Sequence, residues 1–153
     1  MELDKTDRQI LEILQEDAKI NIKVLADKLK LTKTPVYERI RRLEESGWIK
    51  SYIAILDSQK LTHKMVVFCS VSLENQKLEA IEAFGNAVSS IPEVLECYLL
   101  GGAKDFILKV VVKDLADYHK FSSGILAALP NVAQINSSFV LNEVKRSNAY
   151  PVD

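Results

Sequence analysis

The feature that most constrains the fold of this chain is the pattern of side chains over residues 33–45. Val36, Ile40 and Leu43 recur at the i, i+4, i+7 spacing that places apolar residues on one face of a helix. A second stripe carries hydroxyl, aromatic, carboxylate and guanidinium groups: Thr34, Tyr37, Glu38 and Arg41. A helix with a core face and such a polar face fits the DNA major groove, which admits one helix and offers base-edge donors and acceptors.

Two shorter helices are predicted before this one, with Asp4 and Asn21 as N-caps. Thr32 is predicted to cap the striped helix, and Gly47 to end it. Helix-turn-helix units often have glycine where this chain has Lys30, and a left-handed backbone at a non-glycine residue costs roughly 1 kcal/mol. Residues 48–57 are rich in strand-forming types, which predicts a small hairpin or wing with Trp48 packed over the helices.

Positive charge is concentrated on the turn and the striped helix, although the net charge of the chain is −1. Residues 28–50 hold seven basic and three acidic side chains, whereas residues 1–27 hold four basic and seven acidic ones. A phosphate backbone would meet this basic segment. Arg39 is open to two interpretations, a phosphate contact or an ion pair within the protein, for instance with Glu44. The side chains that we expect to contact DNA are Thr32, Lys33, Thr34, Tyr37, Glu38, Arg41, Arg42 and Lys50.

The second half of the chain changes its period and contains a repeat. Strands are predicted over residues 65–73, 94–100, 106–112 and 132–144, with helices over residues 77–91 and after Asp114. The phrases Ile91-Pro92-Glu93-Val94 and Leu129-Pro130-Asn131-Val132 lie 38 residues apart, and each ends a helix and opens a strand. This duplicated βαβ order predicts a ferredoxin-like βαββαβ sandwich. Its first strand is apolar on both sides, so we expect the uncovered sheet face to pair with a second copy.

These patterns predict an α+β protein with a winged helix-turn-helix domain at residues 1–57, a linker at 58–64 and the ferredoxin-like domain at 65–153. No apolar run approaches the roughly 20 residues of a membrane span, and the N-terminus has no signal pattern, so we expect a cytoplasmic protein. Cys69 and Cys97 lie in apolar strands and are expected to be buried hydrophobes. With His63 and His119 they give no zinc spacing, so no metal or cofactor is expected.

The whole chain resembles the Lrp/AsnC (feast/famine) family of bacterial and archaeal transcription regulators. The matching phrases, in family order and spacing, are Leu3-Asp4-Lys5-Thr6-Asp7-Arg8-Gln9-Ile10-Leu11, Leu25-Ala26, Thr34-Pro35-Val36-Tyr37-Glu38-Arg39-Ile40-Arg41-Arg42-Leu43-Glu44, Gly47-Trp48-Ile49 and Gly102-Ala103-Lys104-Asp105-Phe106. The resemblance implies a C-terminal (RAM-type) domain that senses an amino acid or related metabolite. It also implies homodimers that assemble into octamers or similar rings on double-stranded DNA.

The resemblance further implies an effector site between subunits, against the glycine-bearing turn before the third strand. Carried over, this site comprises Gly101, Gly102, Ala103, Lys104 and Asp105, with Ser137 at a position that usually holds a threonine hydroxyl. Two residues depart from the family pattern, because position 103 is often acidic and position 104 usually aromatic. Lys104 would favour a ligand with an acidic side chain or face solvent, and free turn N–H groups can hold a carboxylate. The alternative is a turn whose glycines only satisfy backbone geometry.

Two other function classes are weighed against this one. An architectural protein that compacts DNA without a ligand shares every N-terminal feature, but its stability and assembly would not respond to any metabolite. An enzyme would need an acid–base or nucleophile arrangement, and Asp105 has no histidine, cysteine or second carboxylate near it in the sequence. The sequence therefore predicts a regulator rather than an enzyme.

Overall fold

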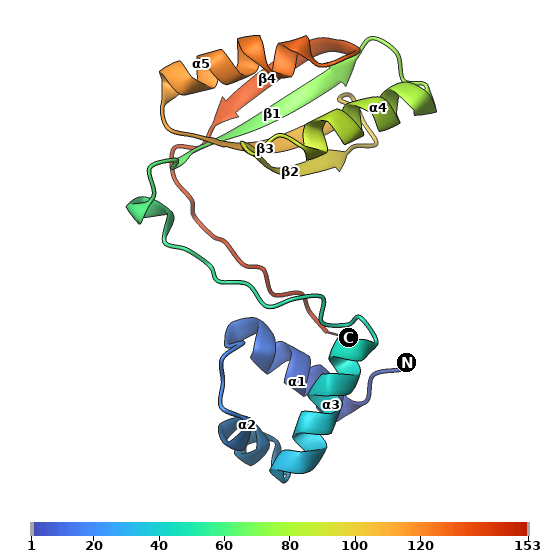
Figure 1. Ribbon diagram of the computed structural model, residues 1–153, viewed down its shortest axis with the longest axis vertical. Helices are drawn as coiled ribbons and strands as arrows, with labels where there is room; N and C mark the ends of the chain where they lie inside the picture. The colour runs from blue at the N-terminus through green and yellow to red at the C-terminus, as the bar shows by residue number, and fades with distance from the viewer. Residues whose placement is uncertain (1, 153) are drawn as a thin grey trace. The chain divides into compact units, whose positions relative to one another are not determined.

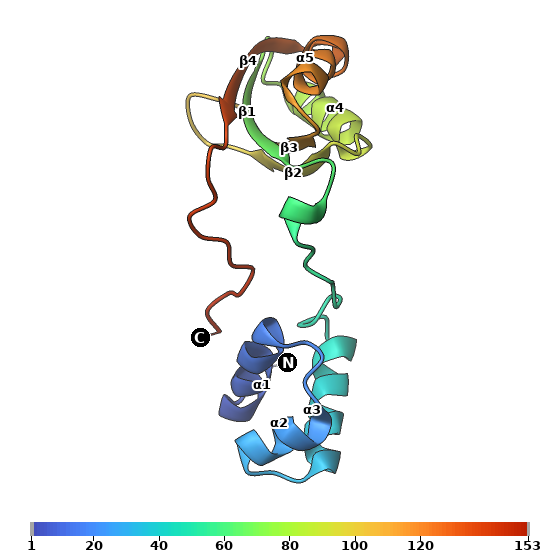
Figure 2. The same ribbon diagram turned by 90° about the vertical axis from the view of Figure 1, so that its left-hand side faces the viewer.

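The computed structural model describes residues 2–152 and divides them into two compact units. One unit consists of the chain up to Ile55 together with the tail from Lys145 onward, and the other spans Leu56–Val144. Each unit is described by itself (Figures 1 and 2). Among the described residues, every helix is too short or too polar to cross a membrane.

The first unit is built on three helices, α1 (Lys5–Glu16), α2 (Ile22–Leu29) and α3 (Lys33–Glu45). Asp4 caps α1 in a capping box, in which its carboxylate accepts from the Asp7 backbone N–H at 2.8 Å while Asp7 reaches back to the Asp4 N–H. Asn21 caps α2 through the Lys23 N–H at 2.8 Å. Apolar residues from all three helices fill two adjoining clusters, with these buried side chains: Leu3, Ile10, Leu11, Leu25, Ala26, Val36 and Leu43.

The turn between α2 and α3 contains a left-handed residue that is not glycine. Lys30 has φ 56° and ψ 41°, and its N–H donates to the carbonyls of Ala26 and Asp27 at the end of α2. Thr32 occupies the N-cap position of α3, but its side chain makes no capping hydrogen bond. Gly47, with φ 78°, lies directly after the C-cap Ser46 of α3, at the left-handed position predicted for it.

The predicted strand over residues 48–57 is wrong, because the structure assigns no strand to this segment. Ile53 and Ile55 are 72% and 66% exposed, so the apolar residues that suggested a strand have no neighbour to pair with or pack on. Trp48 is not the expected cover for the helices, since half of it is exposed. Ile49, the next residue, packs against the helical core instead.

The second unit confirms the βαββαβ order. Its elements are β1 (Met65–Leu73), α4 (Leu78–Ser89), β2 (Val94–Leu99), β3 (Phe106–Val112), α5 (Leu115–Gly124) and β4 (Val132–Phe139), with short 3₁₀ turns at Ser58–Lys60 and Leu126–Ala128. The strands form one antiparallel sheet in the order β2-β3-β1-β4. Both helices cover the same face of this sheet (Figure 2). The arrangement is the ferredoxin-like sandwich expected from the repeat.

The register of the sheet decides which side chains enter the core. Cys69 pairs with Leu108 on β3 and with Ser137 on β4, so these residues share the helix-covered face. Phe84 and Phe106 meet there with ring centroids 4.6 Å apart. The opposite face carries Phe68, which is 37% exposed, and neither α4 nor α5 covers that face.

The last strand is shorter than predicted, since β4 ends at Phe139 and not at residue 144. Phe139 lies opposite Val67, and the Val140 N–H makes one more bond to Val66 near the start of β1. A strand continues only while it has a partner, so the pairing stops where β1 begins.

The C-terminal tail packs on the helical unit. The Gln15 side-chain amide on α1 donates to the Tyr150 carbonyl at 3.0 Å and accepts from the Tyr150 N–H at 2.6 Å. Val152 packs against the cluster of Leu3, Ile10, Leu11 and Leu43. The predicted boundaries put this tail in the C-terminal domain at residues 65–153, whereas its contacts group it with the helical unit.

Candidate functional sites

The polar stripe of α3 lies on the surface, opposite the core stripe. Val36 and Leu43 are completely buried, and Ile40 is partly buried between them. Tyr37 is 59% exposed although it is aromatic, so the described residues leave more than half of its surface uncovered. The remaining exposed residues expected to meet DNA are Thr32, Lys33, Thr34, Glu38, Arg41, Arg42 and Lys50. A continuous accessible face therefore runs along α3 and both of its ends.

Arg41 is held only loosely by the protein. Its Nε donates to Glu45 Oε1 at 2.7 Å, one turn along the same helix, and this carboxylate raises the pKa of Arg41. Both side chains are more than 60% exposed. Exposed i, i+4 ion pairs contribute only about 0.3–0.5 kcal/mol, so Arg41 can exchange Glu45 for another acceptor at little cost.

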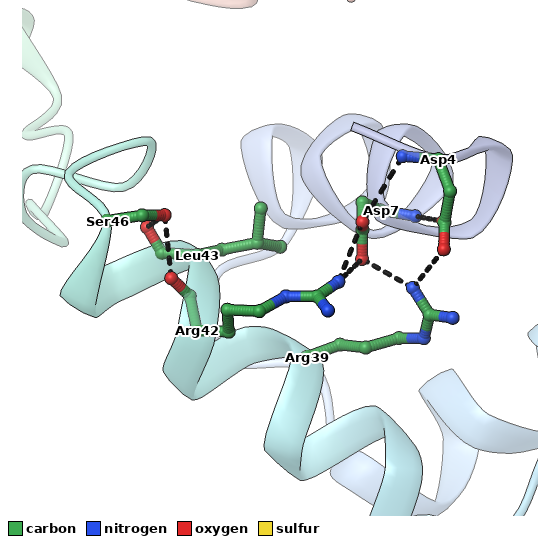
Figure 3. Close-up of polar contacts among 6 residues, drawn as sticks. All are labelled: Asp4, Asp7, Arg39, Arg42, Leu43 and Ser46. Carbon is green, nitrogen blue, oxygen red and sulfur yellow. Dashed lines mark hydrogen bonds and ion pairs between the residues drawn. The ribbon is translucent and has the colours of Figure 1, made fainter. Parts of the chain in front are cut away.

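Arg39 and Arg42 face α1 (Figure 3). Arg39 Nη1 donates to Asp4 Oδ2 and to Asp7 Oδ1, both at 2.6 Å. Arg42 Nη2 donates to the two oxygens of Asp7 at 3.0 and 2.9 Å. Of the two interpretations of Arg39, the structure shows the ion pair within the protein, with Asp4 and Asp7 as its partners. Glu44, the partner suggested by the sequence, instead accepts from the Tyr52 hydroxyl at 2.8 Å.

This cluster shifts the titration of its more exposed members. The Asp7 backbone N–H, and after it the Arg39 guanidinium, lower the pKa of Asp4. Hydrogen bonds to Asp4 and Asp7 raise the pKa of Arg39. Each group therefore stays charged over a wider pH range than usual.

The ion pairs reduce the positive charge that is available to DNA. Arg39, Arg41 and Arg42 each have an acidic partner. The other four basic residues of the segment 28–50 make no ion pair within the described part of the chain: Lys28, Lys30, Lys33 and Lys50.

In the second unit, the turn from residue 100 to residue 105 is fixed by Asp105. The Asp105 carboxylate accepts from the Leu73 N–H at 2.7 Å, and its own N–H donates to the Val71 carbonyl at 3.0 Å. The Asp105 carbonyl accepts from the Leu100 N–H at 2.8 Å. Asp105 thereby attaches the turn to the end of β1, where the pairing of β1 with β4 is irregular.

The exposed part of this turn is open. Gly101, Gly102 and Ala103 are exposed, and a Cβ added to either glycine would meet no atom within 4 Å. Neither glycine has the left-handed φ that favours glycine. Backbone geometry and packing in this chain therefore do not account for the two glycines.

Lys104 and Ser137 lie at different places relative to the turn. The Lys104 Nζ donates to Gln134 Oε1 on β4 at 2.9 Å. Ser137 is three residues further along the same strand, so its side chain points to the opposite face of the sheet. Within one chain, residues 101–105 thus lie together in the turn, whereas the Ser137 side chain lies on the opposite face of the sheet from Gln134.

Ser137 instead belongs to a hydrogen-bonded row that no sequence pattern predicts. The Ser137 hydroxyl forms a hydrogen bond with the Tyr118 hydroxyl on α5. The Tyr118 oxygen also lies 3.2 Å from Cys69 Sγ on β1. Burial raises the pKa of Tyr118 to about 12 and also raises the pKa of the Cys69 thiol. Nothing in the spacing of these three residues signals their contact, because it depends on which face of the sheet α5 covers.

Within residues 2–152 no group of three His, Cys, Asp or Glu residues is arranged to hold a metal ion. Cys69 is buried and Cys97 partly buried, and both are free thiols.

Comparison with known proteins identifies both parts of the chain. A family model described as "Lrp/AsnC ligand binding domain" matches residues 66–150, and one described as "Winged helix-turn-helix DNA-binding" matches residues 3–50. The chain belongs to the Lrp/AsnC family.

Relatives align over nearly the whole of this Lrp/AsnC chain. The Bkd operon transcriptional regulator of Pseudomonas aeruginosa is 41% identical over 99% of both chains, and the proline dehydrogenase transcriptional activator of Rhodobacter capsulatus is 42% identical over 96% of both. Among solved structures, a transcriptional regulator of Neisseria meningitidis in complex with L-Met has a TM-score of 0.93 and 33% identity, covering 98% of this chain and 97% of that one.

These matches confirm the predicted fold and class of function. This Lrp/AsnC protein is a transcription regulator with a DNA-binding helix-turn-helix domain and a ligand-binding domain. The ligand-independent architectural role is not favoured, since the matching C-terminal family model is that of a ligand-binding domain.

Proposed function

We propose that this regulator reads DNA with the exposed stripe of α3. Thr34, Tyr37, Glu38 and Arg41 would face base edges in the major groove, because they form the accessible line opposite the buried Val36 and Leu43. Phosphate contacts would come from the residues that border this stripe: Thr32, Lys33, Arg42 and Lys50. The lone exposed aromatic ring of Tyr37 among these polar groups is the observation that most supports this assignment.

The effector proposed for the second unit is an amino acid. The support is the match to a ligand-binding family model and the relative solved with L-Met. The proposed site is the turn with Gly101, Gly102, Ala103, Lys104 and Asp105. Neither glycine of this turn is required by the backbone conformation or by close packing within the chain. Ser137 would join it only from a different subunit, because its side chain lies on the other face of the sheet.

The turn suggests how an amino acid would be held. Exposed backbone N–H groups beside glycines can bind an α-carboxylate. Lys104 has only the neutral Gln134 as a partner, so its ammonium can turn to an acidic side chain of the ligand. Asp105 is already committed to the Leu73 N–H and would support the turn rather than contact the ligand.

The proposed assembly is a homodimer formed through the uncovered sheet face, which then builds an octamer or similar ring. Phe68 and Tyr98, at 37% and 55% exposure, lie on the face opposite the helices and would be buried by a second copy. A dimer also carries two copies of α3 and would read two half-sites. Such a protein would act in the cytoplasm, where its DNA is.

The effector proposal is tested by thermal unfolding of the purified protein with each of the twenty amino acids at millimolar concentration. A ligand at 100 times its dissociation constant adds roughly 2.7 kcal/mol to the unfolding free energy. We expect one chemical class to raise the midpoint, and the rise to be lost in a Gly102→Val variant. A flat panel would exclude an amino acid effector in this affinity range.

The DNA proposal is tested by selecting duplexes from a random library and measuring their affinity by fluorescence anisotropy. We expect Lys33→Ala to weaken binding to selected and scrambled duplexes alike, and to reduce the salt slope by about one unit. A change confined to the selected duplex would assign Lys33 to base reading instead.

A further inference from the structure

Asp7 is the one charged residue in the part of the chain that the structure describes whose side chain is fully buried. Ionised carboxylates are excluded from protein interiors unless hydrogen bonds and opposite charges replace the water that they lose. The proposed DNA contacts give Asp7 no role, because it lies on α1 and not on the exposed stripe of α3.

The replacement for water comes from α3. Asp7 Oδ1 accepts from Arg39 Nη1 at 2.6 Å and from Arg42 Nη2 at 3.0 Å, and Oδ2 accepts from Arg42 Nη2 at 2.9 Å (Figure 3). The Asp4 N–H adds a longer bond to Oδ2 at 3.3 Å. Both oxygens are therefore saturated, chiefly by arginines of one neighbouring helix.

The two arginines occupy a specific sector of α3. At about 100° per residue, Arg39 lies roughly 60° and Arg42 roughly 120° around the helix from Val36. Both lie on the same side, between the core stripe and the Glu38 edge of the exposed stripe. An attachment there adds directional, charge-assisted hydrogen bonds that oppose rotation of α3 about its own axis, beside the non-directional apolar packing of the core stripe.

Arg42 connects this attachment to the surface. Its side chain is 50% exposed while Nη2 is held by Asp7, whereas Arg39 is only 27% exposed and lies between two carboxylates. A guanidinium has five N–H donors in a fixed plane, so those not used by Asp7 are oriented outward in a defined direction.

We propose that Asp7 is a positioning residue for DNA recognition: through Arg39 it sets the rotation of α3, and through Arg42 it orients a phosphate contact. The inference rests on the proposed reading of DNA by α3. It assigns to a buried acid of the first helix an effect on sequence preference, although this acid does not touch DNA.

The sign of the effect separates this proposal from simple electrostatics. Asp7→Asn removes a negative charge near the DNA-binding face, which by charge alone would tighten binding to every duplex. If Asp7 positions α3 and Arg42, its replacement has the opposite effect on the preferred duplex, and the affinity for that duplex should fall. We expect the ratio of selected to scrambled affinity to drop about tenfold or more, from the range of 10³ or above that is typical of specific binding.

The experiment uses the full chain, a duplex selected by the wild-type protein from a random library, and a scrambled duplex of the same length. Glu12→Gln is the matched control, since Glu12 lies exposed on the same helix, makes no ion pair with the described residues, and the change in charge is the same. The ratio is the deciding readout, because partial unfolding lowers both affinities by the same factor and leaves it unchanged.

The proposal would be overturned if the Asp7→Asn and Glu12→Gln variants had the same ratio of selected to scrambled affinity. Arg39→Lys decides the matter if Asp7→Asn does not fold, because lysine keeps the charge but cannot span Asp4 and Asp7. For that variant we expect a reduced ratio with unchanged scrambled-duplex affinity, and an unchanged ratio would again overturn the proposal. Failure of the wild-type protein to enrich any duplex would instead contradict the assignment of α3 as the DNA-reading element.

Discussion

At the scale of single residues, the arginines of α3 divide by what they contact within the protein. Arg41 pairs with Glu45 on its own helix and is 68% exposed. Arg39 and Arg42 pair with acids of α1. Arg41 is therefore the guanidinium that can approach a base edge without breaking a contact between helices.

Arg41→Ala is accordingly expected to reduce sequence discrimination and leave stability nearly unchanged. A bidentate contact between arginine and a base is worth about 1–3 kcal/mol of discrimination, against about 0.3–0.5 kcal/mol for the exposed pair with Glu45. Competition binding between selected and scrambled duplexes, together with urea unfolding, measures both quantities. Arg8→Ala, which removes an exposed arginine from α1, is the control for charge. Equal effects of the two variants would contradict the base-reading role of Arg41.

Asp4 makes the helical unit sensitive to acid. Its pKa is lowered below the ordinary 3.8 in the folded protein, chiefly by the Asp7 N–H and then by Arg39. A depressed carboxyl pKa contributes stability that is present above the unfolded value and is lost as the pH falls through the folded one. We therefore expect Asp4→Asn to be less stable than wild type at pH 7, with the difference shrinking as the pH falls below 3.8.

Urea unfolding of wild type and Asp4→Asn at pH 7 and near pH 3 checks this expectation. Asparagine is as good an N-cap as aspartate, so the substitution tests mainly the charge. Asp27→Asn, at an exposed position without an ion pair in the described chain, gives the baseline. A difference between wild type and Asp4→Asn that is equal at both pH values would show that the carboxylate charge does not stabilise the fold.

The partners of the buried acid show what residue patterns can predict. The helical period identified the core and exposed faces of α3 from Val36, Ile40 and Leu43. It left Arg39 with two interpretations, because periodicity places a side chain on a face but does not show what lies across from it. The N-cap role of Asp4 accounts for that residue locally, and no sequence pattern marks Asp4 or Asp7 as an acceptor for α3.

At the scale of elements, the turn between α2 and α3 contains avoidable strain. Lys30 adopts φ 56°, a conformation that costs a residue with a side chain about 1–2 kcal/mol. Lys30→Gly should therefore stabilise the protein by about 0.5–1 kcal/mol, after the greater entropy of glycine in the unfolded chain is subtracted. Thermal or urea unfolding measures the change.

The control for this prediction is Lys28→Gly, two residues earlier, where the backbone is helical. That substitution should destabilise the protein by about 1 kcal/mol, the usual penalty of glycine within a helix. The two variants lose the same charge, so opposite signs isolate the backbone effect. Destabilisation by both would show that the left-handed turn is not strained.

The strands show why element boundaries were predicted unequally well. β1 and β3 begin and end where the sequence predicted, because each lies between two neighbouring strands and its core-facing side chains are buried. The segments 48–57 and 141–144 contain strand-forming residues but have no partner strand within residues 2–152. Strand formation depends on pairing, and the sequence of the segment itself does not record whether a partner is there.

At the scale of the whole molecule, two covalent connections join the units. The chain leaves the helical unit after Ile55 and returns to it from Lys145 onward. The returning tail is bound by the paired amide contacts of Gln15 with Tyr150 and by Val152 on the helical core. The tail therefore contacts α1, and α1 in turn contacts α3 through Asp7.

The tail should therefore contribute to the stability of the helical unit. Deleting residues 148–153 removes two hydrogen bonds and an apolar contact, which together predict a loss of about 1–2 kcal/mol. Hydrogen exchange followed by mass spectrometry resolves the effect by segment, and we expect faster exchange in α1 with little change in β1 and β3. Gln15→Ala should reproduce part of the effect without altering the chain length. Unchanged exchange in α1 after the deletion would show that the tail does not stabilise the helices in solution, and the connection after Ile55 would then be the sole route between the units.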